Sequence, residues 1–202
     1  MSENFKLIVI TSEKNIAGEA GLINDLFNAG LQMLHMRKPT HTIDEIRKLL
    51  NVISPAYHSK IVLHNHYELL NDYNLKGAHL PEKIRKEGIA GKIKHIVSTS
   101  FHSPEDILTT KLNLEYAFFS PVFESISKQG YKPIRETKIL NAFFKNNKDR
   151  IRFPIIALGG ITDKNILQTR DIGFSGAACI GYIWENTSPV AQFKKLQKIV
   201  QG

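Results

Sequence analysis

The strongest constraint on this chain is an alternation of short apolar runs with helix-like segments, which repeats along its whole length. We count eight apolar runs, and segments with apolar residues at helical spacing follow them. Alternation of this kind is typical of parallel strands joined by crossover helices. Eight units favour a closed barrel over an open sheet, so we predict one α/β domain over residues 1–202, a (β/α)8 TIM barrel. The predicted strands cover residues 7–11, 33–37, 60–64, 77–80, 95–99, 116–120, 155–158 and 177–180.

Helix starts are predicted from capping residues and prolines between these runs. Thr42 or Thr40 is expected to cap the second helix, because a threonine hydroxyl accepts from the free backbone N–H groups of a first turn. Ser103-Pro104 is a strong helix start, with proline at the first helical position. Thr162 or Asp163 is expected to cap the helix after the seventh strand.

Composition excludes several classes of partner. Lys plus Arg is 27 and Asp plus Glu is 19, which gives a formal charge of +8, but the basic residues are scattered and form no run of five. This distribution argues against a nucleic-acid-binding arm. No apolar run approaches a membrane span and the N-terminus lacks the shape of a signal peptide, so we expect a cytoplasmic protein without a membrane partner. The single cysteine, Cys179, has apolar neighbours that predict an inert buried thiol.

Two glycine turns follow one another near the end of the chain. Gly159-Gly160 ends the seventh apolar run and Ile180-Gly181 ends the eighth. Glycine lets the backbone approach a ligand closely, and the N–H groups that open a following helix can receive a phosphate. One such turn alone would read as a plain strand-to-helix turn. Two in succession resemble the phosphate site that a barrel builds after its last two strands.

Polar residues gather at the predicted carboxyl ends of the strands, where such barrels carry their chemistry. Cations, hydroxyls and imidazoles dominate this set, and the acids near it are Glu82 and Glu124. Arg and Lys pair with phosphate oxygens, while hydroxyl and backbone N–H groups complete an anion site. The pattern predicts anion recognition by residues that include His35, Arg37, Lys38, His64, Asn65, His79, Ser98, Ser125, Ser127 and Lys128.

Each of these residues also has a structural interpretation. His79 could be a core histidine whose nitrogens are satisfied by neighbours. The run from His64 to His66 could suggest a metal, but three consecutive strand positions do not face one centre, so we do not expect zinc there. Residues 124–130 could form a surface turn, although their length and their Ser, Lys and Gly content favour an active-site lid.

With these residues placed, the chain resembles the thiamine phosphate synthase family, which also contains the thiazole tautomerases. The resemblance extends over residues 7–184 and is carried by the segments 34–38, 77–80, 97–99, 102–105, 120–128 and 156–161, in that order. It implies a barrel that joins a hydroxymethylpyrimidine diphosphate to a thiazole phosphate and releases pyrophosphate. The implied partners are therefore small phosphorylated pyrimidines and thiazoles, and a homo-oligomer is compatible with the sequence.

The resemblance also implies roles for individual residues. Those that match the diphosphate-holding positions, and are the implied catalytic residues, are Arg37, Ser98 and Lys128. The implied substrate-binding residues are His35, Lys38, His64, Asn65, His79, Ser125, Ser127, Gly159, Gly160, Ile180 and Gly181. Of these, Gly160, Ile180 and Gly181 match the thiazole-phosphate site, while Ser125 and Ser127 stand where the family usually carries threonines.

Two departures from the family pattern concern the cations. The family's Gln-x-Arg-x-Lys reads His35-Met36-Arg37-Lys38-Pro39 here, so the lysine lies one place early. The family's Asn-Asp after the third strand reads His64-Asn65, and its second magnesium-binding acid corresponds to Ile84. Direct carboxylate ligation of Mg²⁺ is therefore expected to be lost, although Glu82 or the diphosphate itself could still hold the ion.

Two other functions remain open from the sequence. A thiazole tautomerase or another isomerase could use His35, His64 or His79 as a proton carrier, because imidazole titrates near neutral pH. The tautomerase branch, however, carries a catalytic histidine where Pro121 stands. The third function is a phosphate-binding barrel without synthase activity.

Overall fold

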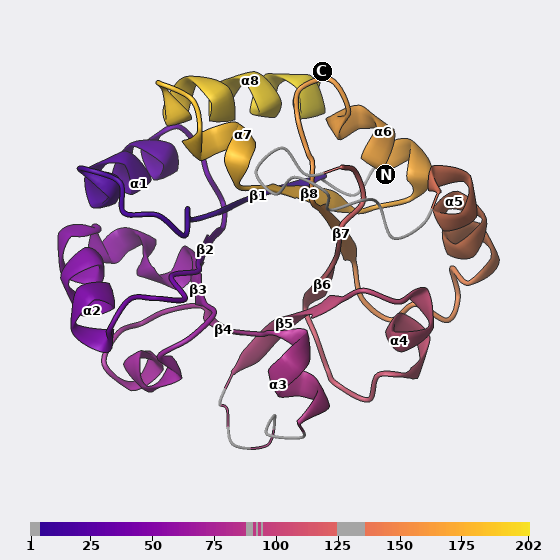
Figure 1. Cartoon of the computed structure of the whole chain (residues 1–202), viewed down its shortest axis with the longest axis horizontal. Coiled ribbons are helices and arrows are strands. Elements are labelled where there is room, and N and C mark those ends of the chain that lie inside the picture. The colour runs from indigo at the N-terminus through magenta and orange to yellow at the C-terminus, as the bar shows by residue number, and fades with distance from the viewer. Residues whose placement is uncertain (1–4, 88–90, 92, 94, 125–135) are drawn as a thin grey trace.

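The described part of the chain forms a closed barrel of parallel strands in which neighbours in sequence are neighbours in space. The computed structural model describes residues 5–87, 91, 93, 95–124 and 136–202. Each strand pairs with the next, and β8 closes the ring against β1, with helices forming an outer layer around the strands (Figure 1). The predicted (β/α)8 barrel is confirmed. The strands are β1 (Lys6–Ile10), β2 (Leu34–Met36), β3 (Ile61–Leu63), β4 (Gly77–Leu80), β5 (Ile96–Phe101), β6 (Tyr116–Phe119), β7 (Ile155–Leu158) and β8 (Gly176–Cys179).

The outer layer consists of short helices and two 3-10 turns. The turns η1 (Pro55–Lys60) and η2 (Tyr67–Asn71) flank β3. None of the described helices is long and apolar enough to span a bilayer. The helices are α1 (Glu19–Asn28), α2 (Ile43–Val52), α3 (Glu82–Lys86), α4 (Pro104–Thr109), α5 (Thr137–Asn146), α6 (Ile166–Ile172), α7 (Gly181–Trp184) and α8 (Pro189–Gln201).

Side-chain capping begins two of these helices as predicted, whereas a third helix has another N-cap residue and no capping hydrogen bond from its side chain. Thr42 accepts from the Glu45 N–H at 3.3 Å and the Glu45 carboxylate reaches back to the Thr42 N–H, which makes a full capping box. Ser103 caps α4, with Pro104 at its first position. The predicted cap of α6 was wrong. Its N-cap is Asn165, and the Asn165 side chain instead accepts from the Thr162 N–H at 2.8 Å.

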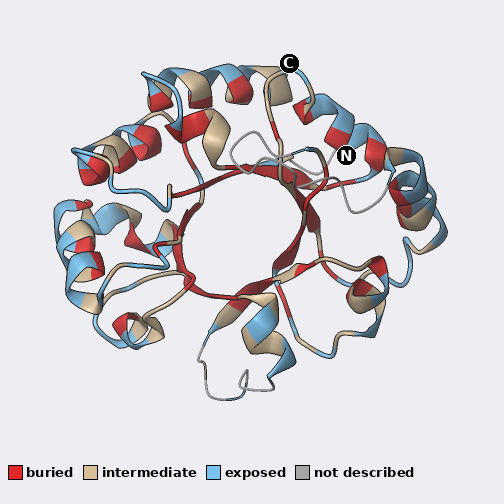
Figure 2. Cartoon of the chain, viewed as in Figure 1, coloured by how far each residue is buried: buried red, intermediate tan, exposed pale blue. Residues whose placement is uncertain are grey.

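Alternation along each strand separates two apolar layers. In β2, Leu34 and Met36 face outward and pack under the helices, so His35 between them faces the barrel interior. The inner layer is a small cluster of buried side chains from β1, β6, β7 and β8, and the strands are buried on both faces (Figure 2). Cys179 is buried and its pKa is raised to about 12 by desolvation, which confirms the predicted buried thiol. A polar side chain on the inner face of β2 therefore has to find its partners inside the barrel.

Candidate active site

A cavity of about 690 Å³ opens at the carboxyl ends of the strands, and the ends of all eight strands contribute to its wall. This is the face at which barrels of this class carry their chemistry. The structure brings together nine of the residues that the sequence singled out for this face. The predicted residues that line the cavity are Arg37, His64, Asn65, His79, Glu82, Gly159, Gly160, Ile180 and Gly181.

Other predicted residues do not reach the cavity. His35, Lys38 and Ser98 are fully buried behind its wall, so our expectation that they contact a ligand directly is not met by their positions. Burial makes each of them a support for a residue in front of it. Ser125, Ser127 and Lys128, together with most of the expected lid, lie outside the described residues.

Arg37 directly follows β2 and lines the cavity with its side chain. Its backbone is clamped to the end of β1, because the Arg37 N–H donates to the Thr11 hydroxyl at 2.8 Å and that hydroxyl donates to the Arg37 carbonyl at 3.1 Å. The guanidinium forms an ion pair with Glu13, and the two side chains are 33% and 42% exposed. An anion that enters the cavity therefore meets a cation that already has a solvent-accessible carboxylate partner.

Lys38 is buried and acts on the loop after β1. Its ammonium lies 2.5 Å from the Glu19 carboxylate and donates to the Lys14 carbonyl at 2.9 Å. Burial raises the pKa of Glu19, and the Lys38 cation opposes that rise. Because this lysine lies one place early, it does not reach the cavity as the expected ligand-binding cation. It instead holds the segment that carries Glu13 and Lys14 at the cavity wall.

Two imidazoles, those of His64 and His79, lie on the floor of the cavity, and the His35 ring is buried directly behind them. His35 Nδ1 and His64 Nε2 share a hydrogen bond of 2.8 Å, and the rings of His64 and His79 stack with centroids 4.1 Å apart. The strand register shifts between Ala78 and His79, which places His79 opposite Ser98 on β5. The nitrogens of His79 consequently lie 2.9 Å from the hydroxyls of Ser98 and Ser100.

All three imidazoles are held neutral. Burial lowers the pKa of His35 and His64 far below the ordinary value, and the neighbouring histidines add to the effect. Burial, with a smaller contribution from the Arg37 cation, lowers the pKa of His79 to about 3. These groups do not titrate near neutral pH, so the reasoning that made them neutral-pH proton carriers does not hold for the folded protein.

The two glycine turns form the opposite part of the wall. Gly159 and Gly160 have φ of 98° and 65°, which L-residues rarely adopt, and a Cβ built on Gly160 would lie 2.8 Å from the Phe123 Cβ. Asn165 holds this turn, since its amide donates to the Gly160 carbonyl at 2.8 Å. Gly181 begins the short helix α7, and such a helix often completes the phosphate site of a barrel.

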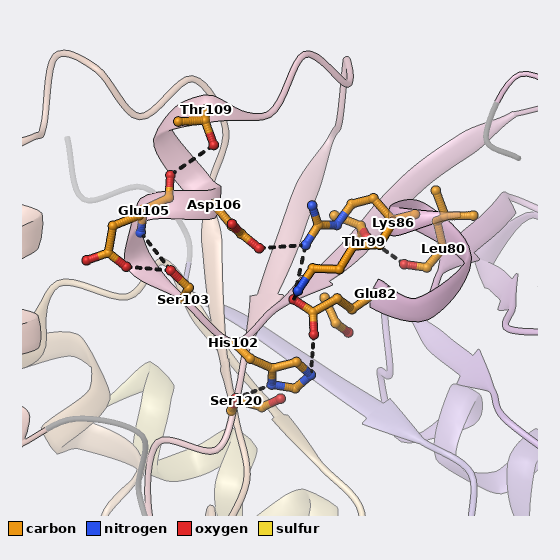
Figure 3. Close-up of polar contacts among 12 residues, drawn as sticks. Leu80, Glu82, Lys86, Thr99, His102, Ser103, Glu105, Asp106, Thr109 and Ser120 are labelled. Carbon is orange, nitrogen blue, oxygen red and sulfur yellow. Dashed lines mark hydrogen bonds and ion pairs between the residues drawn. The ribbon is translucent and has the colours of Figure 1, made fainter. Parts of the chain in front are cut away.

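Glu82, the acid that we considered for Mg²⁺, is already engaged. Its carboxylate lies 3.2 Å from Lys86, 3.2 Å from Arg85 and 3.8 Å from the His102 imidazole (Figure 3). Asn65 lines the cavity but offers an amide, and Ile84 has no ligand atom. Because Mg²⁺ is usually held by one or two carboxylates together with phosphate oxygens, the family's two acid positions do not fit it here.

Sequence reasoning missed several groups on the cavity wall. The acids near the strand ends were expected to be Glu82 and Glu124, yet Glu13 and Glu185 also line the cavity. Glu13 lies in the loop after β1 and Glu185 directly follows α7, and no motif marked either residue. His102, whose Nδ1 lies 2.5 Å from the Ser120 carbonyl (Figure 3), belongs to the segment 102–105 that carries the family resemblance, but we did not predict it on the cavity wall. Ser12, Lys14 and Tyr182 also line the cavity and were not predicted.

Comparison with known proteins finds similarity to one family over nearly the whole chain. The sequence model of the thiamine monophosphate synthase family matches residues 7–183. A thiamine-phosphate synthase of Dictyoglomus turgidum is 24% identical over an alignment of 213 positions, and the alignment covers 98% of this chain and 90% of that protein. The crystal structure of a thiamine phosphate pyrophosphorylase from Bacteroides thetaiotaomicron has a TM-score of 0.80 and 31% identity, with 98% of both chains covered. A thiamine phosphate pyrophosphorylase from Pyrococcus furiosus shares the fold, with a TM-score of 0.76, 21% identity and coverage of 99% and 97%.

Proposed function

Because the chain belongs to the thiamine monophosphate synthase family, we propose that it is a thiamine-phosphate synthase. It would join a hydroxymethylpyrimidine diphosphate to a thiazole phosphate and release pyrophosphate. The observation that carries the proposal is one cavity with two kinds of anion-binding feature. Arg37 lies after β2, and the glycine turns Gly159-Gly160 and Ile180-Gly181 follow β7 and β8. Two phosphorylated substrates that react with each other need two anion-binding sites in one cavity.

The reaction transfers the pyrimidine methylene carbon from the diphosphate oxygen to the thiazole nitrogen without a protein nucleophile. The bond between the pyrimidine methylene and the diphosphate oxygen breaks, and its electron pair stays on the diphosphate. The lone pair of the thiazole nitrogen then forms the new C–N bond, so that no proton has to be removed at that nitrogen. Stabilisation of the departing charge is the main task of the protein, and Arg37 provides it at the cavity wall.

The neutral floor supports the same reaction. A carbocation-like methylene would be opposed by nearby positive charge, and protonated imidazoles at the floor would supply it. The low pKa of His64 and His79 keeps this part of the wall uncharged at neutral pH. Ser98 holds one nitrogen of His79 at 2.9 Å, so we assign it a positioning role through that ring.

Mg²⁺ has no carboxylate ligand at the family's acid positions in the described residues, and we route no step through it. Positive charge for the diphosphate comes in our proposal from Arg37 and from Lys14, both on the cavity wall. Lys128 matches a diphosphate-holding position and remains a prediction, as do a cytoplasmic location and a homo-oligomer.

Incubation of the purified protein with both phosphorylated precursors tests the proposal. Thiamine phosphate and pyrophosphate should form in equal amounts. Arg37→Gln should lower kcat/KM by roughly 100- to 1,000-fold, the usual effect of removing one preorganised charge-stabilising donor. Arg47→Gln is the matched control, because Arg47 is similarly exposed at 39% and pairs with Asp72 at 46%, outside the cavity.

The same experiment separates the other two functions. Absence of thiamine phosphate under every metal condition would reject synthase activity. Tight binding of thiazole phosphate without turnover would indicate a phosphate-binding barrel. Interconversion of thiazole isomers would indicate a tautomerase, a function opposed by Pro121 on the cavity wall where that branch carries its catalytic histidine.

A further inference from the structure

Three buried imidazoles from consecutive strands converge beneath the cavity. His35 lies in β2, His64 directly follows β3 and His79 lies in β4, and these strands are neighbours in the barrel (Figure 1). One nitrogen from each ring lies within 4.8 Å of the corresponding nitrogens of the other two. Their positions in the sequence share no metal-binding spacing, so only the fold brings them together.

We propose that His35, His64 and His79 bind one divalent transition-metal ion of the zinc class. Neutral imidazole is a preferred ligand of Zn²⁺, Co²⁺ and Ni²⁺, whereas Mg²⁺ selects oxygen. His64-Asn65 stands where the family resemblance implies an amide and an acid, so an imidazole has entered where oxygen ligands would serve Mg²⁺. The proposal rests on these three side chains and not on the proposed reaction, whose uncharged floor is that of the metal-free protein.

The required movement of the rings is small. Tetrahedral Zn²⁺ with bonds of about 2.0–2.1 Å places its ligand nitrogens about 3.3 Å apart. The pair formed by His35 Nδ1 and His64 Nε2, now at 2.8 Å, needs to open by about 0.5 Å, and the proton between them moves to the other nitrogen of its own ring. No gap in the cluster exceeds 4.8 Å, so none needs to close by more than about 1.5 Å.

Neighbouring hydroxyls support the tautomers that a metal needs. If His35 ligates through Nδ1, its Nε2 carries the proton and donates to the Tyr116 hydroxyl, which lies 2.6 Å away. If His79 gives up one of its two serine partners, Ser98 or Ser100, the other still accepts from the remaining N–H. Such outer partners fix ring orientation and raise the affinity of metal-ligating histidines.

The electrostatics of the cluster also permit a cation. Because the three imidazoles are neutral at neutral pH, no proton has to leave the cluster when a metal binds; each ring keeps its proton on the nitrogen that does not ligate. The nearby Arg37 opposes a second cation, but Glu13 pairs with that guanidinium and offsets its charge. His64 and His79 line the cavity, so the fourth coordination position would face the space in which ligands bind.

The test is titration of the chelator-treated, full-length protein with Zn²⁺ by calorimetry and with Co²⁺ by visible absorption. Wild type should bind one ion per chain, and Co²⁺ should give the intense visible bands of a tetrahedral nitrogen site. Titration with Mg²⁺ should produce no binding heat at this site, and added Mg²⁺ should not weaken the binding of Zn²⁺. His64→Asn and His35→Gln restore the amides that the family carries at those positions, so both variants should fold.

Each of the two variants should bind Zn²⁺ at least about 10- to 100-fold more weakly, since even loss of an outer-shell partner costs that much. His95→Asn is the matched control and should bind as wild type does. His95 is exposed and has a positive φ of 53°, which asparagine tolerates. The proposal fails if wild type binds no stoichiometric ion. It also fails if His64→Asn and His35→Gln bind as tightly as His95→Asn, because the ion would then lie elsewhere.

Discussion

Replacement of Lys38 by methionine tests whether the buried ion pair with Glu19 holds the loop after β1. The Lys38 and Glu19 side chains are 0% and 3% exposed, and their charged atoms are 2.5 Å apart. Methionine keeps the apolar stem but leaves the Glu19 carboxylate buried without its cation, which costs about 3–5 kcal/mol of unfolding free energy. For a chain of this length each kcal/mol lowers Tm by about 2–4 °C, so Lys38→Met should melt about 6–20 °C below wild type.

The control for this change is Lys195→Met. Lys195 lies at the same 2.5 Å from Asp163, but its side chain is 57% exposed, so its loss should cost at most about 1 kcal/mol. The double variant Lys38→Met with Glu19→Gln should recover most of the loss, because no unpaired charge remains buried. Urea unfolding measures all four proteins. A cost for Lys38→Met no larger than for Lys195→Met, or a double variant no more stable than the single one, would refute the reasoning.

The sign of the pH dependence provides a second check on this pair. Burial already raises the pKa of Glu19 above its ordinary value of 4.5, and removal of Lys38 takes away the interaction that opposes the rise. The folded variant then binds a proton more readily than the unfolded chain does. Its stability should therefore increase as the pH falls through the raised pKa, and the deficit relative to wild type should shrink there. A deficit that stays constant with pH would show that the loss is one of packing alone.

Three further predictions concern the cavity. Glu13→Gln should lower KM for the pyrimidine diphosphate by up to about fivefold, since the half-exposed pair with Arg37 contributes about 1 kcal/mol at most; a higher KM in steady-state kinetics would contradict this. Gly160→Ala should raise KM for thiazole phosphate by about tenfold or more and lower stability by about 1–3 kcal/mol, because φ is 65°; an equal effect on both substrates would argue against a thiazole-phosphate site. In metal-free protein, the contribution of neutral His79 to the free energy of unfolding is complete above pH 6.5 and is lost as the pH falls toward 3. Between pH 7 and 5 the wild type should therefore lose about 2 kcal/mol more unfolding free energy than His79→Asn, as measured by urea unfolding.

The fold could be predicted because its signal is distributed along the chain. Most strands are short apolar runs, and their alternation with segments of helical spacing repeats often enough to imply closure. Single helix starts were less secure. The cap of α6 moved to Asn165, because its side chain closes the glycine turn by holding both Thr162 and Gly160. A propensity scale cannot anticipate that kind of tertiary demand.

Residues of the cavity wall could be predicted where they lie at the end of a strand, but not where they lie in a turn. Arg37 and His79 follow the period-two pattern of their strands. Glu13 and Glu185 reach the wall from turns, whose path the sequence does not specify. Lys38 follows Arg37 directly and so points to the other side, where it meets Glu19 from α1. The sequence does not show how deeply each side chain is buried, and this burial decides whether a polar group contacts a ligand or another side chain of the protein.

Depth also organises the charges of the cavity. Ionised groups such as Arg37 and Glu13 lie where water reaches them, whereas the floor carries imidazoles that burial keeps neutral. A departing diphosphate is thus met by cations at the wall, while the carbon that it leaves develops positive charge over an uncharged surface. A protonated His64 at 4 Å would oppose that charge by about 4 kcal/mol at an effective dielectric constant of 20. Turnover should therefore be insensitive to pH through the range in which an ordinary histidine titrates, and a decline centred near pH 6.5 would show that the floor carries charge during catalysis.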